Sequence, residues 1–408
     1  MILVVTLHRT IMLQCPQKVR IDFFVLCLLS WALCVGCGSD TSTNTADESA
    51  YMADYEAPEN KWGFVDTTGA ILIKPVFDDV SGFSEGYAAV NKSGKWGFIG
   101  RSGKMVIQPQ FKSAWAFHEG LARVKPFDQP EQFITSGGKR IVSDEWTAAG
   151  DFSGGLAKVM VGSTYGYTDT SGQLVIPAIY DRASDFKAGL AVIGFDGHLG
   201  IINTLGKEVI PASYDKVKLL DKENLVLCNL SDTGIVFDLH GNELVRIPDA
   251  TLLESNGKIV AVKKEGKTYF FDLVASEMLA QHEWVNVIYL DEDRWAAKNE
   301  FGYILLDATG KPISRKSYSQ INKFINGLAA YHKTNSWGYM NLSGVEQTVD
   351  VFGLAWDYKE GFARAAFADG IAFLDRNQKI AFYPPGGTIN MRDFSEGLAP
   401  VQIAGQQD

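Results

Sequence analysis

One stretch of this chain recurs along most of its length, and that recurrence constrains the fold more than any single residue. The segment 61–90 reads KWGFVDTTGAILIKPVFDDVSGFSEGYAAV, and the segment 95–124 keeps the same residue types 34 positions later. Self-similarity at such a period is typical of repeat architectures, in which each unit packs on its neighbours. Two longer gaps each contain one degenerate copy, which makes about ten units between Lys61 and Val401. The glycines that mark the copies are Gly63, Gly97, Gly166, Gly200, Gly234, Gly302 and Gly338, with Gly370 a weaker match.

Each unit is interpreted as three short β-strands. An aromatic-rich strand such as 62–65 ends in an Asp-x-x-Gly turn, and a second apolar strand follows and stops at a proline such as Pro75 or Pro109. The third piece carries an aromatic residue before x-x-Gly and then a small apolar strand. Aspartate accepts hydrogen bonds from turn amides, glycine tolerates a positive φ, and proline cannot donate to a strand ladder.

Short strands separated by frequent turns, with no long helical apolar stripe, predict an all-β fold. We expect a tandem array of about ten three-stranded units of about 34 residues, packed radially like the blades of a propeller. Propeller blades usually have four strands, and ten blades exceed the usual closed ring. Two lobes, an open spiral and a β-solenoid therefore remain as alternatives.

The recurring motifs resemble those of the WG-repeat family, also called KWG repeats. They read KWGFVD, KWGFIG, YGYTD, FGYILLD and WGYMN, together with their FSEGLA-like partners, and they extend over about Lys61 to Val401. The central units depart from the pattern, because Gly200 and Gly234 do not follow an aromatic residue. The resemblance implies an extracytoplasmic or surface interaction role, and it carries no catalytic motif.

Residues 1–37 are interpreted as a bacterial lipoprotein signal peptide. Lys18 and Arg20 precede an apolar run of roughly 13 residues, which is too short to cross a bilayer comfortably. The run ends in CVGC, which resembles a lipobox whose cysteine, Cys37, is lipidated; the departure is Cys34, where the pattern prefers leucine. Plain secretion with nearby cleavage and an uncleaved anchor are the alternatives.

The segment after the leader is acidic. Residues 38–60 contain six Asp or Glu residues and no Lys or Arg, so we expect a disordered tether before the array at 61–401. Residues 402–408 form a C-terminal tail. Of the five cysteines, only Cys228 lies in the array, which excludes an intrachain disulfide framework there.

No pattern in the chain indicates catalysis, a metal or a cofactor. The six histidines form neither H-E-x-x-H nor a zinc-ligand set, and a net charge of minus 10 without a basic block argues against a nucleic-acid partner. Carboxylates recur because the repeat recurs, and we expect each to satisfy its own turn instead of acting as a hydrolase acid or base. The four that share the position before the third-piece glycine are Glu85, Glu119, Glu360 and Glu396.

The eight tryptophans of the array fall into two groups. Trp62, Trp96 and Trp337 precede marker glycines, and we expect them to be core wedges between units. The others are off that register, and packing is their default interpretation; exposed on one face, they would suit sugars or peptides. These candidate ligand-facing residues are Trp115, Trp146, Trp284, Trp295 and Trp356.

These features together predict a protein that is not an enzyme. We expect a non-catalytic binding or scaffolding module of the bacterial cell envelope, lipid-anchored and either periplasmic or on the cell surface. Its expected partners are envelope proteins or glycans, and the membrane through the N-terminal lipid. The alternatives are a surface hydrolase for glycans or peptides, with a cleft between units, and a purely structural envelope component.

Overall fold

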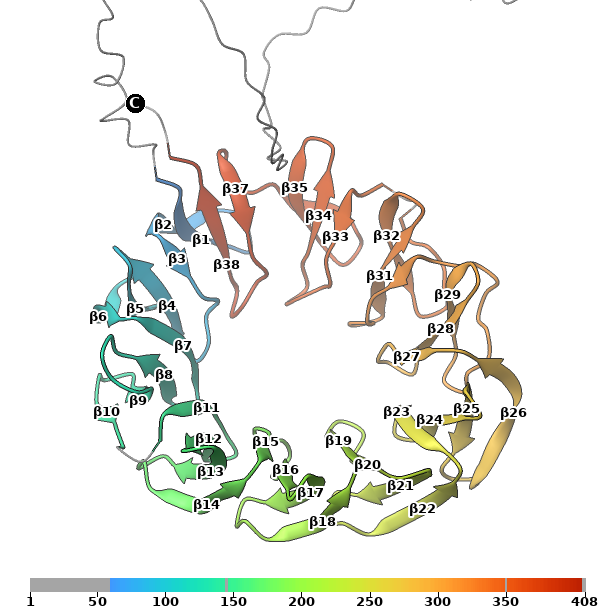
Figure 1. The fold of residues 1–408 in the computed structure, drawn as a ribbon. Helices are drawn as coiled ribbons and strands as arrows, with labels where there is room; N and C mark the ends of the chain where they lie inside the picture. Colours follow the sequence, from blue (N-terminus) through green and yellow to red (C-terminus); the bar gives the residue numbers. More distant parts are fainter. Residues whose placement is uncertain (1–58, 144–145, 349–350, 406–408) are drawn as a thin grey trace, which may run out of the picture. The chain divides into compact units, whose positions relative to one another are not determined.

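Ten small antiparallel sheets follow one another around a ring (Figure 1). The computed structural model describes residues 59–143, 146–348 and 351–405, and within these ranges it contains strands and no α-helix. Eight sheets have four strands and two have three. The prediction of an all-β, propeller-like array of ten units is confirmed.

In each sheet one strand lies nearest the centre of the ring, and we call it the inner strand (Figure 1). The inner strands are β3 (Asp79–Val80), β7 (Ser113–His118), β11 (Ala148–Ser153), β15 (Arg182–Ala183), β19 (Lys216–Leu220), β23 (Thr251–Ser255), β27 (Val287–Tyr289), β30 (Gln320–Ile321), β33 (Leu354–Ala355) and β37 (Thr388–Met391). The second strands are β4 (Tyr87–Lys92), β8 (Leu121–Lys125), β12 (Leu156–Val161), β16 (Leu190–Phe195), β20 (Leu225–Leu230), β24 (Ile259–Lys264), β28 (Trp295–Asn299), β31 (Leu328–Lys333), β34 (Ala363–Phe367) and β38 (Leu398–Ile403).

The remaining strands complete the sheets outward, and the sheets of β27 and β30 have no outer strand. The third strands are β5 (Lys95–Gly100), β9 (Gln132–Thr135), β13 (Thr164–Asp169), β17 (His198–Asn203), β21 (Thr233–Asp238), β25 (Lys267–Asp272), β29 (Gly302–Leu306), β32 (Ser336–Asn341), β35 (Gly370–Leu374) and β1 (Lys61–Asp66). The outer strands are β6 (Met105–Phe111), β10 (Arg140–Ile141), β14 (Leu174–Tyr180), β18 (Glu208–Tyr214), β22 (Glu243–Pro248), β26 (Glu277–Trp284), β36 (Ile380–Phe382) and β2 (Ile71–Phe77).

The expectation of three strands per unit is wrong for most units, because the third sequence piece supplies two strands. The residues before the x-x-Gly turn pair with those after it, as His118 pairs with Leu121 across a two-residue turn. Each sheet therefore combines the last piece of one sequence repeat with the first two pieces of the next. We call such a sheet, with its turns, a unit from here on.

The expectation that the second sequence strand stops at proline is also wrong. Strand β6 continues through Pro109 to Phe111, and its pairing with β5 shifts register between Phe98 and Trp96. Proline is tolerated at this point because β6 is the outermost strand, where an amide is not needed for a further ladder.

The two ends of the array meet in one sheet and close the ring. Strand β1 pairs with β38 in antiparallel register from Lys61 opposite Ile403 to Asp66 opposite Leu398. Arg392 Nη2, beside β37, lies 2.8 Å from Asp79 Oδ1 of the next unit. The open-spiral and solenoid alternatives therefore do not hold.

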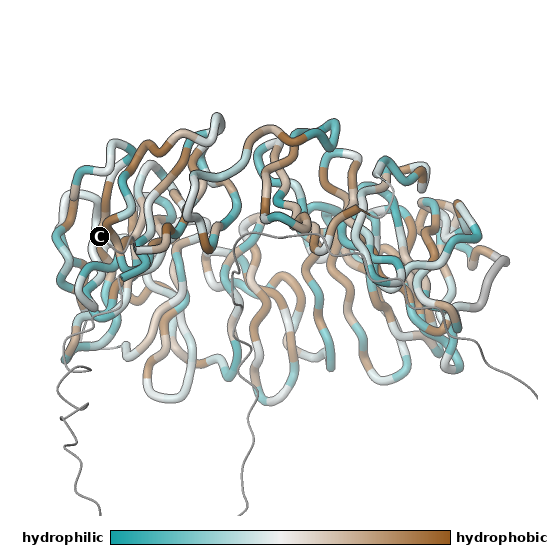
Figure 2. The backbone as a smooth tube through the Cα atoms, turned by 90° about the horizontal axis from the view of Figure 1, so that it is seen from above, coloured by the Kyte–Doolittle hydropathy of each residue, from teal (hydrophilic) through white to brown (hydrophobic). Residues whose placement is uncertain are grey.

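The core lies between neighbouring sheets, where apolar side chains from both meet. Phe98 from β5 and Phe117 from β7 are fully buried, with ring centroids 4.9 Å apart in an edge-on arrangement. Figure 2 shows apolar segments along the strands and many polar segments at the turns. One sheet cannot bury both of its faces alone, so the units stabilise one another in series.

Four marker glycines, Gly63, Gly97, Gly166 and Gly200, occupy a position where two strands approach closely. A Cβ at Gly97 would lie 2.5 Å from the carbonyl oxygen of Ile107 and 2.7 Å from the nitrogen of Pro109. Gly63, Gly166 and Gly200 stand equally close to their outer strands, and at Gly338 the Tyr331 hydroxyl would lie 2.6 Å away.

The prediction that Gly302 occupies the same repeat position is wrong. It pairs with Asn299 at the beginning of β29 and has a φ of 129°, whereas Gly97 pairs with Val90 within its strand. Counted back from the turn aspartate, Gly302 lies two residues too early.

The three marker tryptophans pack against the inter-sheet cores. Trp62 is buried among Phe64, Ile73 and Phe77, while Trp96 and Trp337 are half-buried against neighbouring clusters.

Among the described residues no helix is long and apolar enough to cross a membrane.

We expect Gly97→Ala to lower the free energy of unfolding by more than about 1 kcal/mol, because the added Cβ meets the backbone of β6. Urea unfolding followed by circular dichroism measures the change. The matched control is Gly100→Ala in the same strand, whose Cβ would meet only Val106 Cγ2 at 3.6 Å. Equal effects of the two substitutions would contradict the close approach as the reason for the glycine.

Candidate functional site

The inner strands surround the centre of the ring (Figure 1), and they include positions at which the residue type changes from unit to unit. Nearly every inner strand carries or leads into a buried residue, such as Phe117 or Leu290, that anchors the unit in the core; in β19 the corresponding Leu220 is half-buried. The residue two positions before this anchor differs from unit to unit, and we call it the inner variable position. It is occupied by Ser81, Trp115, Gly150, Ser184, Lys218, Leu253, Ile288, Asn322, Trp356 and Arg392.

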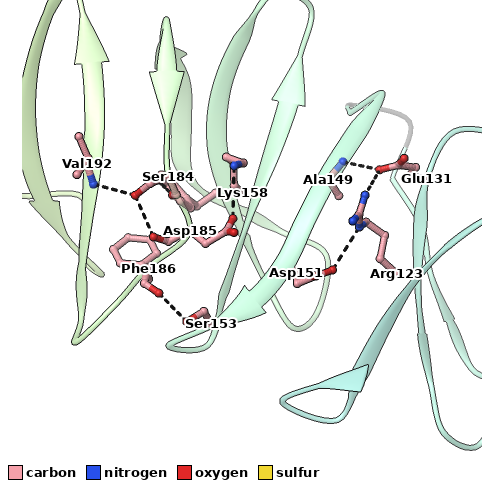
Figure 3. A network of polar contacts seen from close by, with 11 residues as sticks. Arg123, Glu131, Ala149, Asp151, Ser153, Lys158, Ser184, Asp185, Phe186 and Val192 are labelled. Atoms are coloured by element: carbon pink, nitrogen blue, oxygen red, sulfur yellow. Dashed lines mark hydrogen bonds and ion pairs between the residues drawn. The ribbon is translucent and has the colours of Figure 1, made fainter. Parts of the chain in front are cut away.

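Charged side chains near the inner strands connect neighbouring units (Figure 3). Arg123 on β8 lies with Nε 3.3 Å from Asp151 Oδ1 on β11 and with Nη1 3.3 Å from Glu131 Oε2. Glu131 also accepts from the backbone amide of Ala149 at 2.9 Å. One unit later, Lys158 Nζ lies 3.5 Å from Asp185 Oδ1. An ion pair of the same kind thus links successive units in this part of the ring.

A similar ion pair links two units near the C-terminal end of the array. Arg364 donates from Nε to Asp393 Oδ1 at 2.6 Å and from Nη1 to the carbonyl oxygen of Met391 at 2.7 Å. Lys218 and Glu254 form a further pair between neighbouring inner strands. The partly exposed pairs of Lys158 and Lys218 contribute modestly to stability, and all of these pairs place charged groups near the inner strands.

Two of the five candidate tryptophans lie at the inner variable position and stack on arginine. Trp115 has the guanidinium of Arg123 3.9 Å from its ring centroid, and Trp356 has that of Arg364 at 4.6 Å. Both indoles are half-buried. Arginine therefore covers one face of each ring, as a cation over an aromatic face.

Two other candidates do not face a ligand. Trp146 and Trp295 are 1% and 0% exposed, and each indole Nε1 donates at 3.2 Å to a backbone carbonyl, that of Glu131 or that of Ala308. The prediction is wrong for these two because they fill the core in units that have lost the usual landmarks. Trp284 is half-buried beside the core cluster that contains Trp295. The structure does not bring the five residues together on one aromatic face.

On one rim of the ring, glutamates tie five of the ten units to the unit that follows. Glu85 accepts from the backbone amides of Glu119 at 2.6 Å and Gly120 at 2.8 Å, and Glu119 accepts from Gly154 at 2.7 Å and Gly155 at 2.8 Å. We call this arrangement a rim clasp. The other clasps run from Glu292 to Gly327 at 2.7 Å, from Glu360 to Glu396 and Gly397 at 2.7 Å, and from Glu396 to Gly86 at 3.0 Å.

The expectation that each of these glutamates satisfies its own turn is therefore wrong. The side chain points to the turn of the following unit because its own two-residue turn places it at a positive φ, 53° at both Glu85 and Glu119. This backbone conformation disfavours glutamate. Hydrogen bonds from two amides to a carboxylate offset that cost.

A serine beside the clasp adds a second bond to the next unit. Ser84 Oγ donates to the carbonyl oxygen of Phe117 at 2.8 Å, and Ser153 Oγ donates to that of Phe186 at 2.6 Å. Ser395 donates to the carbonyl of Phe83, across the junction of the chain's two ends.

The turn aspartates follow the sequence expectation. Asp66 Oδ1 accepts from the amides of Thr68 at 2.8 Å and Ala70 at 3.1 Å within the same turn. The hydroxyl of Thr68 also donates to it, and these bonds lower the pKa of the Asp66 carboxyl. The stabilisation they bring is present above the ordinary carboxyl pKa and is lost as the pH falls through the lowered value.

Hollows lie between neighbouring units. One of them has a volume of about 740 Å³ and is lined by residues that include Leu190, Lys207, Asn224 and His240. A smaller hollow of about 340 Å³ lies at the inner strands, between Lys218, Leu253 and other residues of β19, β23 and the start of β27.

Few groups in the described ranges have the character of a reactive centre. Cys228 is fully buried, and desolvation raises the pKa of its thiol to about 12, which keeps it protonated. The part of the chain that the structure describes contains no cluster of His, Cys, Asp and Glu suited to a metal ion. Cys37, the predicted lipidation site, lies outside the described residues.

A family model described as "WG containing repeat" matches residues 62–96, 96–125, 165–197 and 200–227. Four copies of the repeat are thereby identified as WG repeats. No curated protein matches the chain.

Three solved structures match the chain at low sequence identity. A eukaryotic initiation factor is 11% identical with a TM-score of 0.49, over 78% of this chain and 97% of that chain. BamB from Moraxella catarrhalis is 12% identical with a TM-score of 0.33, over 80% of this chain and 96% of that one. Hsv2p from Kluyveromyces lactis is 12% identical with a TM-score of 0.32, over 64% and 96%.

We expect Glu119→Ala to lower the free energy of unfolding by about 0.5–1.5 kcal/mol per lost hydrogen bond. The amides of Gly154 and Gly155, which the carboxylate no longer covers, should exchange with deuterium faster. The control is Asp196→Ala, because Asp196 also has a positive φ of 50° but lies in a hairpin that carries no clasp. Unchanged exchange at both glycines would argue against the clasp.

Proposed function

We propose that this ring is a non-catalytic binding or scaffolding module of the bacterial cell envelope. The observation that supports the proposal is a division between constant and variable residues. The repeated Glu, Ser, Asp and Gly residues hold turns and units together, whereas the inner variable position takes eight residue types in ten units.

A constant frame that displays changing side chains suits recognition of a partner by a surface, as in other repeat proteins. The changing residues include cations, aliphatic residues and tryptophans, and the charge pairs around them add acidic groups. The repeated carboxylates accept backbone hydrogen bonds, which suits a structural role better than proton transfer. Envelope proteins and glycans are the partners that we propose.

The proposed location rests on the leader. A lipid on Cys37 would hold the protein on a membrane, with the acidic segment 38–60 as a tether to the folded ring. This anchoring is extracytoplasmic, because lipobox cysteines are processed after export.

Photo-crosslinking in intact cells tests the binding role. A photoreactive residue at Ile288, an inner variable position that is 39% exposed, should give a discrete crosslinked product. The same residue at Val106, on an outer strand and 44% exposed, is the matched control and should not give that product.

Equal products at both positions, or none, would overturn binding at the inner strands and favour a purely structural component. Turnover of a peptidoglycan fragment or a peptide by the purified full-length protein would overturn the non-catalytic assignment. That result would favour the hydrolase alternative.

Membrane fractionation tests the anchor. Cys37→Ser should move the protein from the detergent-dependent membrane fraction to the soluble fraction, because the acyl chains are lost. Cys34→Ser is the control and should remain in the membrane fraction. Retention of the Cys37 variant in membranes would contradict lipidation at this residue.

A further inference from the structure

The rim clasps show what the turns between inner and second strands bind. Each clasped turn has two residues with positive φ, such as Glu119 at 53° and Gly120 at 79°, and it presents backbone amides to the preceding unit. In five turns of the described chain a glutamate carboxylate occupies this position, at 2.6–3.0 Å. The molecule thus contains five examples of one carboxylate site.

Two further turns have the same backbone but no glutamate to fill them. Ala188 and Gly189 have φ values of 48° and 77°, and Glu360 and Gly361 have values of 50° and 89°. Both turns are closed by the same pair of backbone hydrogen bonds, between Lys187 and Leu190 and between Lys359 and Phe362. Their conformation is therefore that of the filled turns.

The preceding unit explains why these turns are open. The clasp position there is occupied by Gly154 before the first turn and by Asn326 before the second. Within the described residues no side chain accepts from the amides of Gly189 or Gly361, and a Cβ on either glycine would meet nothing within 4 Å. In the described part of the chain these two amides therefore lack the carboxylate partner that the clasped amides of Gly120 and Gly155 have.

A lysine accompanies each open turn and none of the filled ones. Lys187 and Lys359 directly precede the two open amide pairs, and both are exposed. Lys359 Nζ lies 3.7 Å from Asp393 Oδ2, on a side chain that remains 59% exposed. In the five filled turns the corresponding residues are Ser84, His118, Ser153, Ile325 and Ser395. Positive charge is thus found where the internal carboxylate is missing.

We propose that the turns Ala188–Gly189 and Glu360–Gly361 bind carboxylates supplied by a protein partner, from an acidic side chain or a C-terminus. Two backbone amides in a positive-φ turn match the two oxygens of a carboxylate, and lysine adds a third, charged donor. The two turns lie five units apart in a ring of ten, so one partner assembly can occupy both sites. This inference rests on the proposed binding function and deepens it, but it concerns the rim, whereas the crosslinking experiment above probes the inner strands.

Nuclear magnetic resonance on the full-length protein in detergent, labelled with ¹⁵N on glycine, tests the sites. The probe is N-acetyl-Gly-Gly with a free carboxylate, and its control is the same peptide with an amidated C-terminus. The amide signals of Gly189 and Gly361 should shift saturably with the carboxylate and not with the amide. The clasped Gly120 and Gly155 should not respond, because an internal carboxylate already fills their sites.

Substitutions that install the missing clasp provide a specific control. Gly154 already has a φ of 67° and Asn326 one of 54°, so glutamate fits there as it does in the filled turns. Gly154→Glu should abolish the response of Gly189 and leave that of Gly361, and Asn326→Glu should do the reverse. Gly154→Gln, without the charge, should block the site less.

Failure of both glycines to respond, an equal response to the amidated peptide, or a response unchanged in Gly154→Glu would overturn the proposal. An amidated peptide with an internal aspartate identifies the source: a response to it supports an acidic side chain, and a response to the free C-terminus alone supports the chain end. A positive result here with no crosslink at Ile288 would leave the rim sites standing and move the binding function away from the inner strands.

Discussion

The pairing of β1 with β38 is the interaction on which the whole ring depends. Every unit buries an apolar face against each neighbour, so an array with two free ends would expose two such faces. Placing the first two strands and the last two in one sheet removes both ends. The polar contacts at this junction, from Arg392 to Asp79 and from Glu396 to Gly86, are of the same kinds as those between other units.

At the clasps, the backbone preference of the turn opposes the hydrogen bonding between units. A two-residue turn with positive φ favours glycine or asparagine, yet four turns place glutamate at its first residue with a φ of 50–53°. The presence of glutamate at this position is explained only by the following unit, whose backbone amides donate to its carboxylate. Where glycine, alanine or asparagine occupies this position, the turn keeps its shape but the rim clasp to the next unit is lost.

Most features that depend on one unit could be predicted from the sequence, whereas several that depend on contacts between units could not. The period predicted a β array, the Asp66 turn bonds as expected, and the Gly97 position has no room for a side chain. The destination of the Glu85 carboxylate and the burial of Trp146 were missed, because both are set by contacts with a segment distant in sequence. Pro109 was misread because a strand end and an outer strand both tolerate proline.

Each sheet combines parts of two sequence repeats, and the first and last strands of the array share one sheet. The point at which the chain enters the ring is therefore arbitrary. Because Lys61 lies opposite Ile403, a short connection between them and a break at another hairpin would preserve every strand pair. The order of the ten units along the chain is therefore one of ten circular permutations that would give the same ring. What distinguishes this permutation is the position of its break, which lies between Lys61 and Ile403 in the sheet that both ends of the array share.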